Sequence, residues 1–514
     1  MMNVLEPVIQ DPDLVSGVLD NGLSYFLKTC NSPANTVELQ LVVNVGSLIE
    51  EENERGLAHF VEHMGFKGTR NFQNGQIVKY LESIGAQYGP DLNASTSLQD
   101  TTYRLSITLP EEEEHHNHDG TGQGNHSSGQ TASDARMERL EAAFEVLADW
   151  AGGMLILDED VESERAIIEE EWRGKQGPSQ RLLEVYWERV FGQGGAAAYA
   201  RRMPIGTLDV IRNAPPQRLR EFYGRWYRPE LMAVIVAGDF GGGGGGGAGP
   251  AAAAAGGHSP LVRHALALLR EKFGSIENQH SVTLASNPSP ELPQFDLPRH
   301  FEKEPGICIL QDSELTSSSL SFEFFSPIET SPTLGYMKTE LIKRLFATLI
   351  DQRLSAISNG TVDTGYEVGP GRGQYISAGI SLRPVVQDLL CVSVTAQVPH
   401  GDLSALGTLV RELERARRRG FGAGELRRAK NKWRAVFAAE LQDAAHRVRA
   451  KSVAADVREH FLRGRRTPLP GRPAELRACL ALLAEEGSSE GGGGGGSDGG
   501  EGAYVAVPSP AEEE

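Results

Sequence analysis

The stretch GLAHFVEHMG, from Gly56 to Gly65, decides how this sequence is interpreted. Its apolar residues recur at helical spacing, which predicts a helix with one buried face. His59 and His63 are then four residues apart and lie one above the other on the same face. Two imidazoles in that arrangement can reach a single zinc ion, so the stretch predicts a metal site.

Glu62 lies one residue before His63 in this stretch. Its carboxylate can therefore lean toward a water at the ion without binding the ion itself, as a general base must. A catalytic zinc site keeps one coordination position open for that water. The alternative is a partly buried helix that happens to carry two histidines.

A third ligand is expected in ESERAIIEEEWR, residues 162–173. Glu164 and Glu171 are two helical turns apart and share one face. Glu171 would complete a two-histidine, one-glutamate set of the metallopeptidase type, with Glu169 and Glu170 as neighbouring alternatives. The other interpretation of this segment is a solvated acidic helix face, which must account for most of its glutamates.

Composition excludes several classes of function. The 514 residues allow two to four domains, and the net charge of −19 disfavours nucleic-acid binding. The sequence contains no run of 18 consecutive apolar residues, so no membrane-spanning helix is predicted. Four scattered cysteines without a CxxC pair predict neither a disulfide framework nor a cysteine zinc finger. The acidic N-terminus resembles neither a signal nor a transit peptide, so we expect a cytoplasmic protein, or an organellar one if the N-terminus is incomplete.

Three stretches lack any apolar period: 111–136, 241–257 and 485–514. We expect the first two to be low-complexity inserts and the third a disordered glycine-rich tail. His115, His116 and His118 are then solvated loop residues rather than metal ligands. The remainder divides into a domain at 14–277, a linker at 281–298 and a second domain at 299–484.

Both domains alternate strand-like and helix-like segments, which predicts the α/β (α+β) class with two similar units in tandem. In the first domain we expect strands at 37–45, 103–109 and 232–237 and helices at 76–84 and 137–152. In the second we expect strands at 319–325 and 392–398 and helices at 334–357 and 403–418.

The chain resembles the M16 family of zinc metallopeptidases, and within it the PqqL-like zinc proteases. The resemblance rests on GSLIEEENERGLAHFVEHMGFKGT (46–69), LESIGAQYGPDLNASTSLQDTTY (81–103) and ERAIIEEEWRGKQG (164–177), with looser similarity in the second domain. It implies two tandem homologous domains, each a mostly antiparallel sheet packed with helices, as in half of an M16 clamshell. The spacing from His63 to Glu171 is longer than is usual in the family, and the excess is about the length of the insert 111–136.

The resemblance also implies roles for individual residues. His59, His63 and Glu171 would bind one zinc ion per chain, Glu62 would be the base, and Glu164 would support the site from behind its ligands. The NAST segment, Asn93, Ala94, Ser95 and Thr96, would pair with the substrate peptide as an edge strand, although without the resemblance it would be taken for an ordinary turn.

The function implied is a metalloendopeptidase that hydrolyses unfolded peptides, with no nucleic-acid or membrane partner. The chain corresponds to only one half of a two-half family member, so a homodimer or a partner half would complete the clamshell. An Arg/Tyr pair that the family takes from its second half has no counterpart here. The alternatives are a non-catalytic or half-enzyme subunit that binds peptides, and, more remotely, a zinc-storing protein built on the His- and Gly-rich loops.

Overall fold

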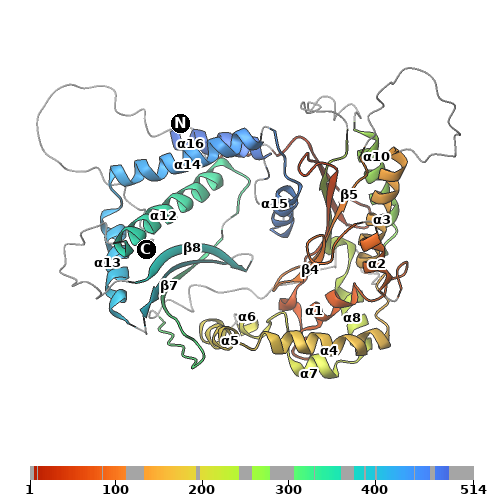
Figure 1. Cartoon of the computed structure of the whole chain (residues 1–514), viewed down its shortest axis with the longest axis horizontal. Helices are drawn as coiled ribbons and strands as arrows, with labels where there is room; N and C mark the ends of the chain where they lie inside the picture. Colours follow the sequence, from red (N-terminus) through yellow and green to blue (C-terminus); the bar gives the residue numbers. More distant parts are fainter. Residues whose placement is uncertain are drawn as a thin grey trace, which may run out of the picture. The chain divides into compact units, whose positions relative to one another are not determined.

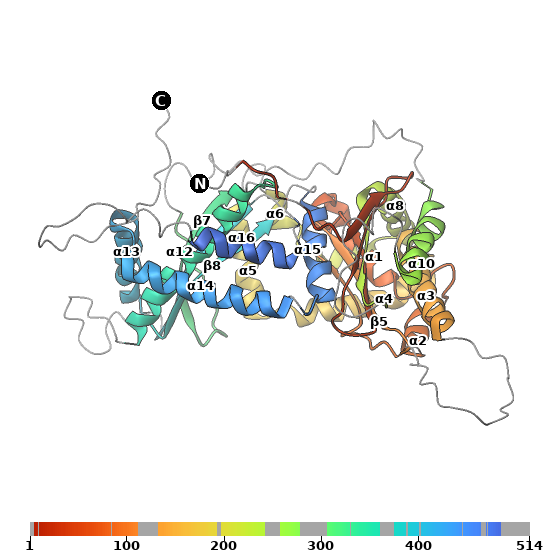
Figure 2. The same ribbon diagram turned by 90° about the horizontal axis from the view of Figure 1, so that it is seen from above.

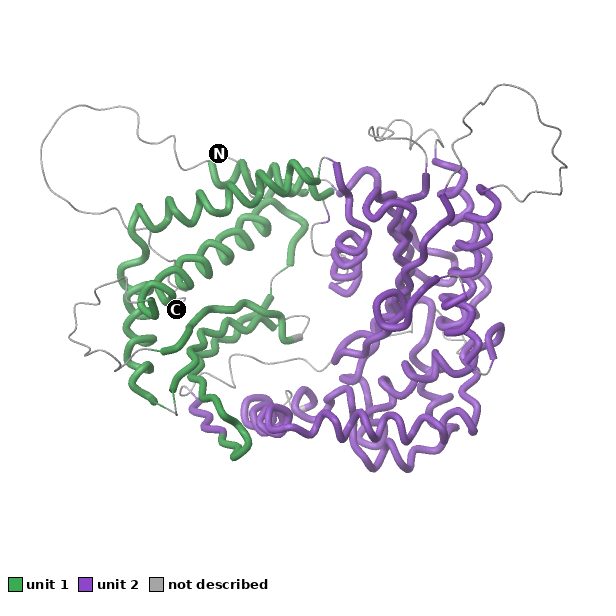
Figure 3. The backbone as a smooth tube through the Cα atoms, in the orientation of Figure 1, with its two compact units in different colours: residues 1–8, 311–445, 470–514 green, residues 9–310, 446–469 purple. Residues whose placement is uncertain are grey.

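Two compact units make up the chain in this computed structural model (Figures 1 and 3). The larger unit contains residues 9–310 and 446–469, and the smaller contains residues 1–8, 311–445 and 470–514. Each is therefore assembled from segments that are separate in sequence, whereas the sequence predicted two consecutive domains. The structure describes residues 5–8, 10–73, 75–83, 85–111, 132–192, 197–241, 258–277, 306–328, 330–359, 375–386, 389–399, 402–444, 446–463, 469 and 471–484.

The predicted linker 281–298 and tail 485–514 lie outside the described residues, as do His115, His116 and His118 and nearly all of the predicted insert 241–257. The insert predicted at 111–136 ends earlier than expected, because helix α3 (Ala132–Gly152) already begins at Ala132. Arg136 is buried there and donates hydrogen bonds to Asn35 Oδ1 (3.0 Å) and the Pro110 carbonyl oxygen (3.1 Å).

A six-stranded sheet forms the centre of the larger unit, in the order β1-β2-β6-β3-β5-β4. Its strands are β1 (Leu14–Val18), β2 (Ser24–Thr29), β3 (Thr36–Val43), β4 (Leu92–Thr96), β5 (Thr101–Thr108) and β6 (Met232–Gly238). Only β2 and β6 pair in parallel, so the sheet is mostly antiparallel, as predicted. Strand β4, which carries the NAST segment, is an edge strand of this sheet.

Most helices of the larger unit lie between β3 and β6 in sequence. They are α1 (Leu57–Met64), α2 (Gln76–Ser83), α3, α4 (Asp158–Gly174), α5 (Pro178–Phe191), α6 (Ala197–Arg201), α7 (Leu208–Asn213), α8 (Pro216–Trp226) and α10 (Pro260–Leu268). Side chains of α1, α3, α8 and α10 form one large core with alternate residues of β3, β5 and β6. Leu39, Leu105 and Val236 are examples from the sheet, and all are 0 % exposed.

Helix α15 (Ala450–Leu462) covers the opposite face of the same sheet, although it comes from far along the chain (Figure 1). Its residues Ala454 and Val457 pack with Val42 of β3 and Ile235 of β6 in a separate core. Strands β3 and β6 are thus buried on both faces, which explains why MAVIVA reads as a continuous apolar run rather than an alternating one.

The smaller unit has a three-stranded antiparallel sheet in the order β7-β9-β8. Its elements are β7 (Ser318–Pro327), α12 (Leu334–Ser358), β8 (Ser377–Val386), β9 (Leu389–Val398), α13 (Ser404–Arg419), α14 (Ala423–Ala444) and α16 (Arg472–Ala484). Helices α14 and α16 lie side by side (Figure 2), and their side chains share a core with α12 and β9. The strands and helices predicted in both domains are all present, with ends shifted by a few residues.

The packing of α15 gives a test of this arrangement. Val457→Asp should lower the free energy of unfolding by about 3 kcal/mol or more, because it places an unpaired carboxylate in the core under the sheet. Ala455→Asp, on the exposed face of the same helix, is the matched control and should change it by less than about 0.5 kcal/mol. Urea unfolding followed by circular dichroism measures both, and equal effects would contradict the packing.

Candidate metal centre

Helix α1 is held at its N-terminus by a buried carboxylate. Glu50, 3 % exposed, accepts hydrogen bonds from the backbone N–H groups of Gly56 and Ala58, both 2.9 Å. Burial raises the pKa of Glu50 to about 8, although the two N–H groups oppose this. Gly56 has a φ of 108°, and a Cβ there would lie 2.9 Å from the Cα of Gly206, so the entry to the helix requires glycine.

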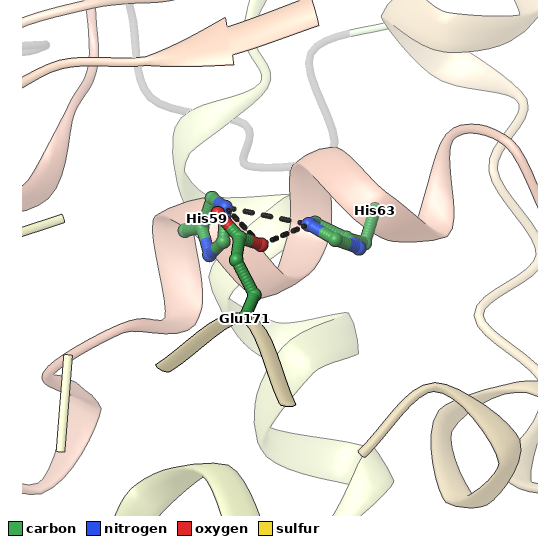
Figure 4. A group of neighbouring side chains, drawn as sticks. All are labelled: His59, His63 and Glu171. Atoms are coloured by element: carbon green, nitrogen blue, oxygen red, sulfur yellow. Dashed lines mark hydrogen bonds and ion pairs between the residues drawn. The ribbon is translucent and has the colours of Figure 1, made fainter. Parts of the chain in front are cut away.

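Three possible metal-binding atoms converge where α1 faces α4 (Figure 4). His59 Nε2 lies 3.3 Å from His63 Nε2, and Glu171 Oε2 lies 3.5 Å from the first nitrogen and 3.4 Å from the second. Tetrahedral ligands at zinc distances of about 2.0–2.1 Å are roughly 3.3 Å apart. The three atoms therefore already have the spacing that a zinc ion requires, and the residues fit this metal.

Glu164 orients the ring of His63 from behind. Its Oε1 lies 2.8 Å from His63 Nδ1, which leaves His63 Nε2 to face the centre, and its Oε2 lies 2.5 Å from Lys67 Nζ. Burial raises the pKa of Glu164, but its bonds to His63 and Lys67 outweigh that effect and lower it. A carboxylate behind a histidine ligand fixes the ring and raises its basicity.

The pKa values of the three converging residues differ because their surroundings differ. Burial, and then the neighbouring His63, lower the pKa of His59 to about 4. Burial also lowers the pKa of His63, but hydrogen bonds with Glu164 and Glu171 outweigh it and raise that pKa to about 9. The bond with His63 lowers the pKa of Glu171 to about 2. Without metal at pH 7, His59 is neutral, His63 is protonated and Glu171 is ionised.

The second oxygen of Glu171 is also engaged, since Oε1 lies 2.5 Å from Lys175 Nζ. Glu169 and Glu170, the alternative third ligands, point elsewhere. Glu169 forms ion pairs with Arg212 and Arg173, and Glu170 pairs with Arg173. Of the three neighbouring glutamates, the structure brings only Glu171 to the two histidines.

Glu62 lies on the same helix and does not join the three converging atoms. Its Oε2 accepts a hydrogen bond of 2.5 Å from the hydroxyl group of Thr96, and its side chain is buried. Burial raises the pKa of Glu62, although the Thr96 hydroxyl lowers it. The carboxylate is thereby fixed beside the centre with a raised proton affinity, as suits a general base.

The predicted NAST segment forms β4, and its residues face both sides of the sheet. Asn93 and Ser95 are exposed, whereas Ala94 and Thr96 are partly buried on the side of α1. Thr96 therefore contacts the candidate base as well as forming part of the edge. This side-chain contact was not predicted, because it joins residues 34 positions apart.

Sequence reasoning also missed Glu50, Lys67 and Lys175. Lys175 follows Glu171 by one helical turn, so the spacing of an i, i+4 ion pair is a usable signal. Lys67 and Glu50 offer no such signal. Lys67 pairs with Glu164 only because α1 packs against α4, and Glu50 reaches the first N–H groups of α1 only because of the path of the loop before that helix.

Comparisons with known proteins show which family the chain belongs to. Residues 25–184 match the family model described as insulinase, peptidase family M16. A zinc protease PQQL-like protein of Arabidopsis thaliana is 31 % identical over 356 residues, which are 69 % of this chain and 31 % of the relative. The chain belongs to peptidase family M16. A probable zinc protease PqqL of Haemophilus influenzae is 30 % identical over 344 residues, which are 67 % of this chain and 31 % of that relative.

Solved structures show the same M16 fold. The first half of the periplasmic protease PqqL from Escherichia coli superimposes with a TM-score of 0.71 at 22 % identity, covering 93 % of this chain and 88 % of that one. The full PqqL structure gives 0.72, with 46 % of its chain covered. In the two curated relatives named above, by contrast, the matched segment is only 31 % of the relative's length. No described helix is both long and apolar enough to cross a membrane.

Proton release tests the centre directly. Because the pKa of His63 is about 9 and those of His59 and Glu171 lie well below 7, a bound metal must displace one proton, from His63. Zinc affinity should therefore rise about tenfold per pH unit between pH 6 and 8. Calorimetry in two buffers of different ionisation enthalpy should give close to one proton released per ion at pH 7.

Glu164→Gln is the companion variant for that measurement. It removes the carboxylate that stabilises the proton on His63, so fewer protons should be released at pH 7. A wild-type release near zero would contradict the assigned charge states.

Proposed function

We propose that this M16 chain is the zinc-bearing half of a metalloendopeptidase that hydrolyses unfolded peptides. The observation that carries the proposal is the convergence of His59 Nε2, His63 Nε2 and Glu171 Oε2 within 3.5 Å of one another, with Glu62 fixed alongside. A zinc ion held by these three atoms supplies Lewis acidity, which polarises a carbonyl group and makes water a stronger acid.

Glu62 performs the proton transfers in this proposal. Its ionised carboxylate accepts a proton from the attacking water, and the resulting acid donates that proton to the leaving amine of the cleaved peptide. A raised pKa suits both steps, because the carboxylate has to bind the proton and then release it. Thr96 holds one oxygen of Glu62 and leaves the other for the reaction.

Strand β4 holds the substrate as an added strand. Its partner β5 occupies one side, and its other edge is an outer edge of the six-stranded sheet. Main-chain hydrogen bonds to that edge would bind any extended segment, which favours unfolded peptides over folded proteins. Thr96 connects the edge to Glu62, so a peptide bound at Asn93–Thr96 lies beside the candidate base.

The second candidate function is a half-enzyme or non-catalytic subunit that binds peptides and needs a partner half. It is favoured by the match to the first half of a PqqL structure, 46 % of the full chain. The partner would be a second copy or a separate half that completes the clamshell. Bound zinc without turnover, with activity restored by an added second half, would establish this alternative.

Glu62→Gln separates catalysis from metal binding. Purified wild-type and variant chains should each contain one zinc, but the variant should lose at least about 100-fold in hydrolysis of a quenched unstructured peptide, since it lacks the base. Equal rates in the two proteins would indicate a contaminating protease and contradict the proposed role of Glu62.

Thr96 gives a finer test. Thr96→Val removes the hydroxyl that stabilises the Glu62 carboxylate, so kcat/KM should fall roughly tenfold. The same loss raises the pKa of Glu62 further, which should move the acidic limb of the kcat/KM profile to higher pH. Thr96→Ser keeps the hydroxyl and should restore both, and a profile that does not move in Thr96→Val would contradict the contact.

A further inference from the structure

A row of polar residues crosses the sheet on the face opposite α1. Asn93 of β4 is directly opposite Arg104 of β5, and Arg104 is directly opposite Gln40 of β3. Because side chains alternate along a strand, all three point away from the core that contains Tyr103 and Leu105. The row therefore begins at the edge strand and runs inward toward the part of the sheet covered by α15.

Arg104 is exposed, and its side chain makes no hydrogen bond or ion pair within the described part of the chain. The charges that act on its pKa are those of Arg458 of α15 and Asp100. Burial, and then the like charge of Arg458, lower the pKa of Arg104. Arg458 already pairs with Glu459, whose Oε1 lies 3.4 Å from its Nη2, so the positive charge left over on this face is that of Arg104.

The neighbouring acids are already engaged. Asp100 accepts hydrogen bonds from Ser97 Oγ (2.6 Å) and Thr102 Oγ1 (2.8 Å), and lies 3.9 Å from Arg458 Nη1. Glu38, farther along β3, accepts a bond from Ser106 (2.9 Å) and lies 3.7 Å from Lys451. Neither acid forms an ion pair with Arg104.

Two further polar groups at this place have no partner among the described residues. Arg458 Nε and Gln40 Oε1 are both buried and unbonded, and the Gln40 side chain belongs to a residue only 7 % exposed. Rotation of an amide about its last bond can present its N–H₂ group instead of its oxygen. Arg104 therefore offers the N–H donors of its guanidinium group on this face of the sheet, and Arg458 Nε and the Gln40 amide are further polar groups on the same face.

The position of this cluster relates it to the substrate edge. A peptide added to β4 would lie two strand spacings from β5, about 10 Å, which an arginine and a glutamate side chain can span together. Alternate residues of such a peptide point toward α1 and the metal centre, and the others point to the face of Asn93 and Arg104.

We infer that Arg104, assisted by Arg458, is a specificity residue that binds a carboxylate of the peptide substrate. The inference rests on the proposed function, because it requires a peptide paired with β4. The carboxylate has two possible sources, an Asp or Glu side chain on the face of Arg104 and the C-terminus of a short peptide. Both sources offer two oxygens, which suits the planar guanidinium group.

The test is a set of quenched peptides that are identical except for a single Glu, or a matched Gln, moved along the sequence. Glu should raise kcat/KM about three- to tenfold over Gln, but only at alternate positions of the peptide, those whose side chains lie on the face of Arg104. This preference for Glu should shrink with added salt. Arg104→Gln should remove the preference, so that matched Glu and Gln peptides are hydrolysed at equal rates. Arg104→Glu should reverse it in favour of Lys.

Arg427→Gln is the matched control, because it removes the same charge from an exposed position of α14 in the smaller unit. It should keep the full preference for Glu. Arg104→Lys retains a positive charge and should keep part of the preference. Circular dichroism establishes that each variant is folded.

The two sources of the carboxylate are distinguished by peptides with free or amidated C-termini. If a side chain is the source, the preference for Glu over Gln should be unchanged by amidation. If the terminus is the source, Glu and Gln peptides should react at equal rates, and amidation should lower kcat/KM about three- to tenfold in the wild type but not in Arg104→Gln. Equal rates for Glu and Gln peptides with wild-type protein, together with no effect of amidation, would overturn the inference and leave the proposed function intact.

If zinc-loaded protein hydrolyses no peptide, the proposed catalytic function fails, and the inference is tested by binding instead. Fluorescence anisotropy of the same labelled peptides with the full chain should then show tighter binding of Glu peptides, lost in Arg104→Gln. Equal affinity for Glu and Gln peptides, with free and with amidated C-termini alike, would overturn the inference in that case.

Discussion

The hydrogen bonds from Gly56 and Ala58 to the buried carboxylate of Glu50 fix the start of α1, and the rest of the site depends on that helix. Helix α1 carries both histidines and the candidate base, so a small rotation would separate three atoms that now lie 3.3–3.5 Å apart. A buried carboxylate at a helix N-terminus also meets the positive end of the helix dipole, which favours its ionised form.

Charge balance explains how so many acidic and basic groups coexist around α1 and α4. Glu171 shares its oxygens between the histidines and Lys175, and Glu164 shares its oxygens between His63 and Lys67. Each carboxylate thus has a cation on one side and an imidazole on the other. The site is preorganised, because these side chains are held in position by their partners before any ion or peptide binds.

The proposed catalytic and substrate-recognition groups lie on opposite faces of the sheet. On the α1 side, Thr96 links the edge strand to Glu62, so the binding edge and the candidate base form one unit. On the other face lie Arg104 of β5 and, from α15, Arg458, whose charge lowers the pKa of Arg104. A peptide strand on β4 would therefore show alternate side chains to catalytic and to recognition groups.

The sequence by itself indicated the secondary structure and the two histidines, and it limited the third converging residue to Glu171 or its neighbours Glu169 and Glu170. The 3.6-residue period around His59 and His63 and the two-turn spacing of Glu164 and Glu171 depend only on local helix geometry, which a single segment carries. These segments occur in the same order as in M16 sequences, which led us to expect the M16 fold. The observed sheet and helices are those of that fold.

Only the tertiary structure decided which glutamate faces the histidines, what holds Glu62, and where α15 lies. Glu169, Glu170 and Glu171 are chemically equivalent in sequence, and the packing of α4 against α1 and α7 turned one of them toward the centre. The Thr96–Glu62 bond and the packing of α15 on β3 and β6 join residues from distant segments. Such contacts depend on how elements pack in space, and no local period in the sequence records that.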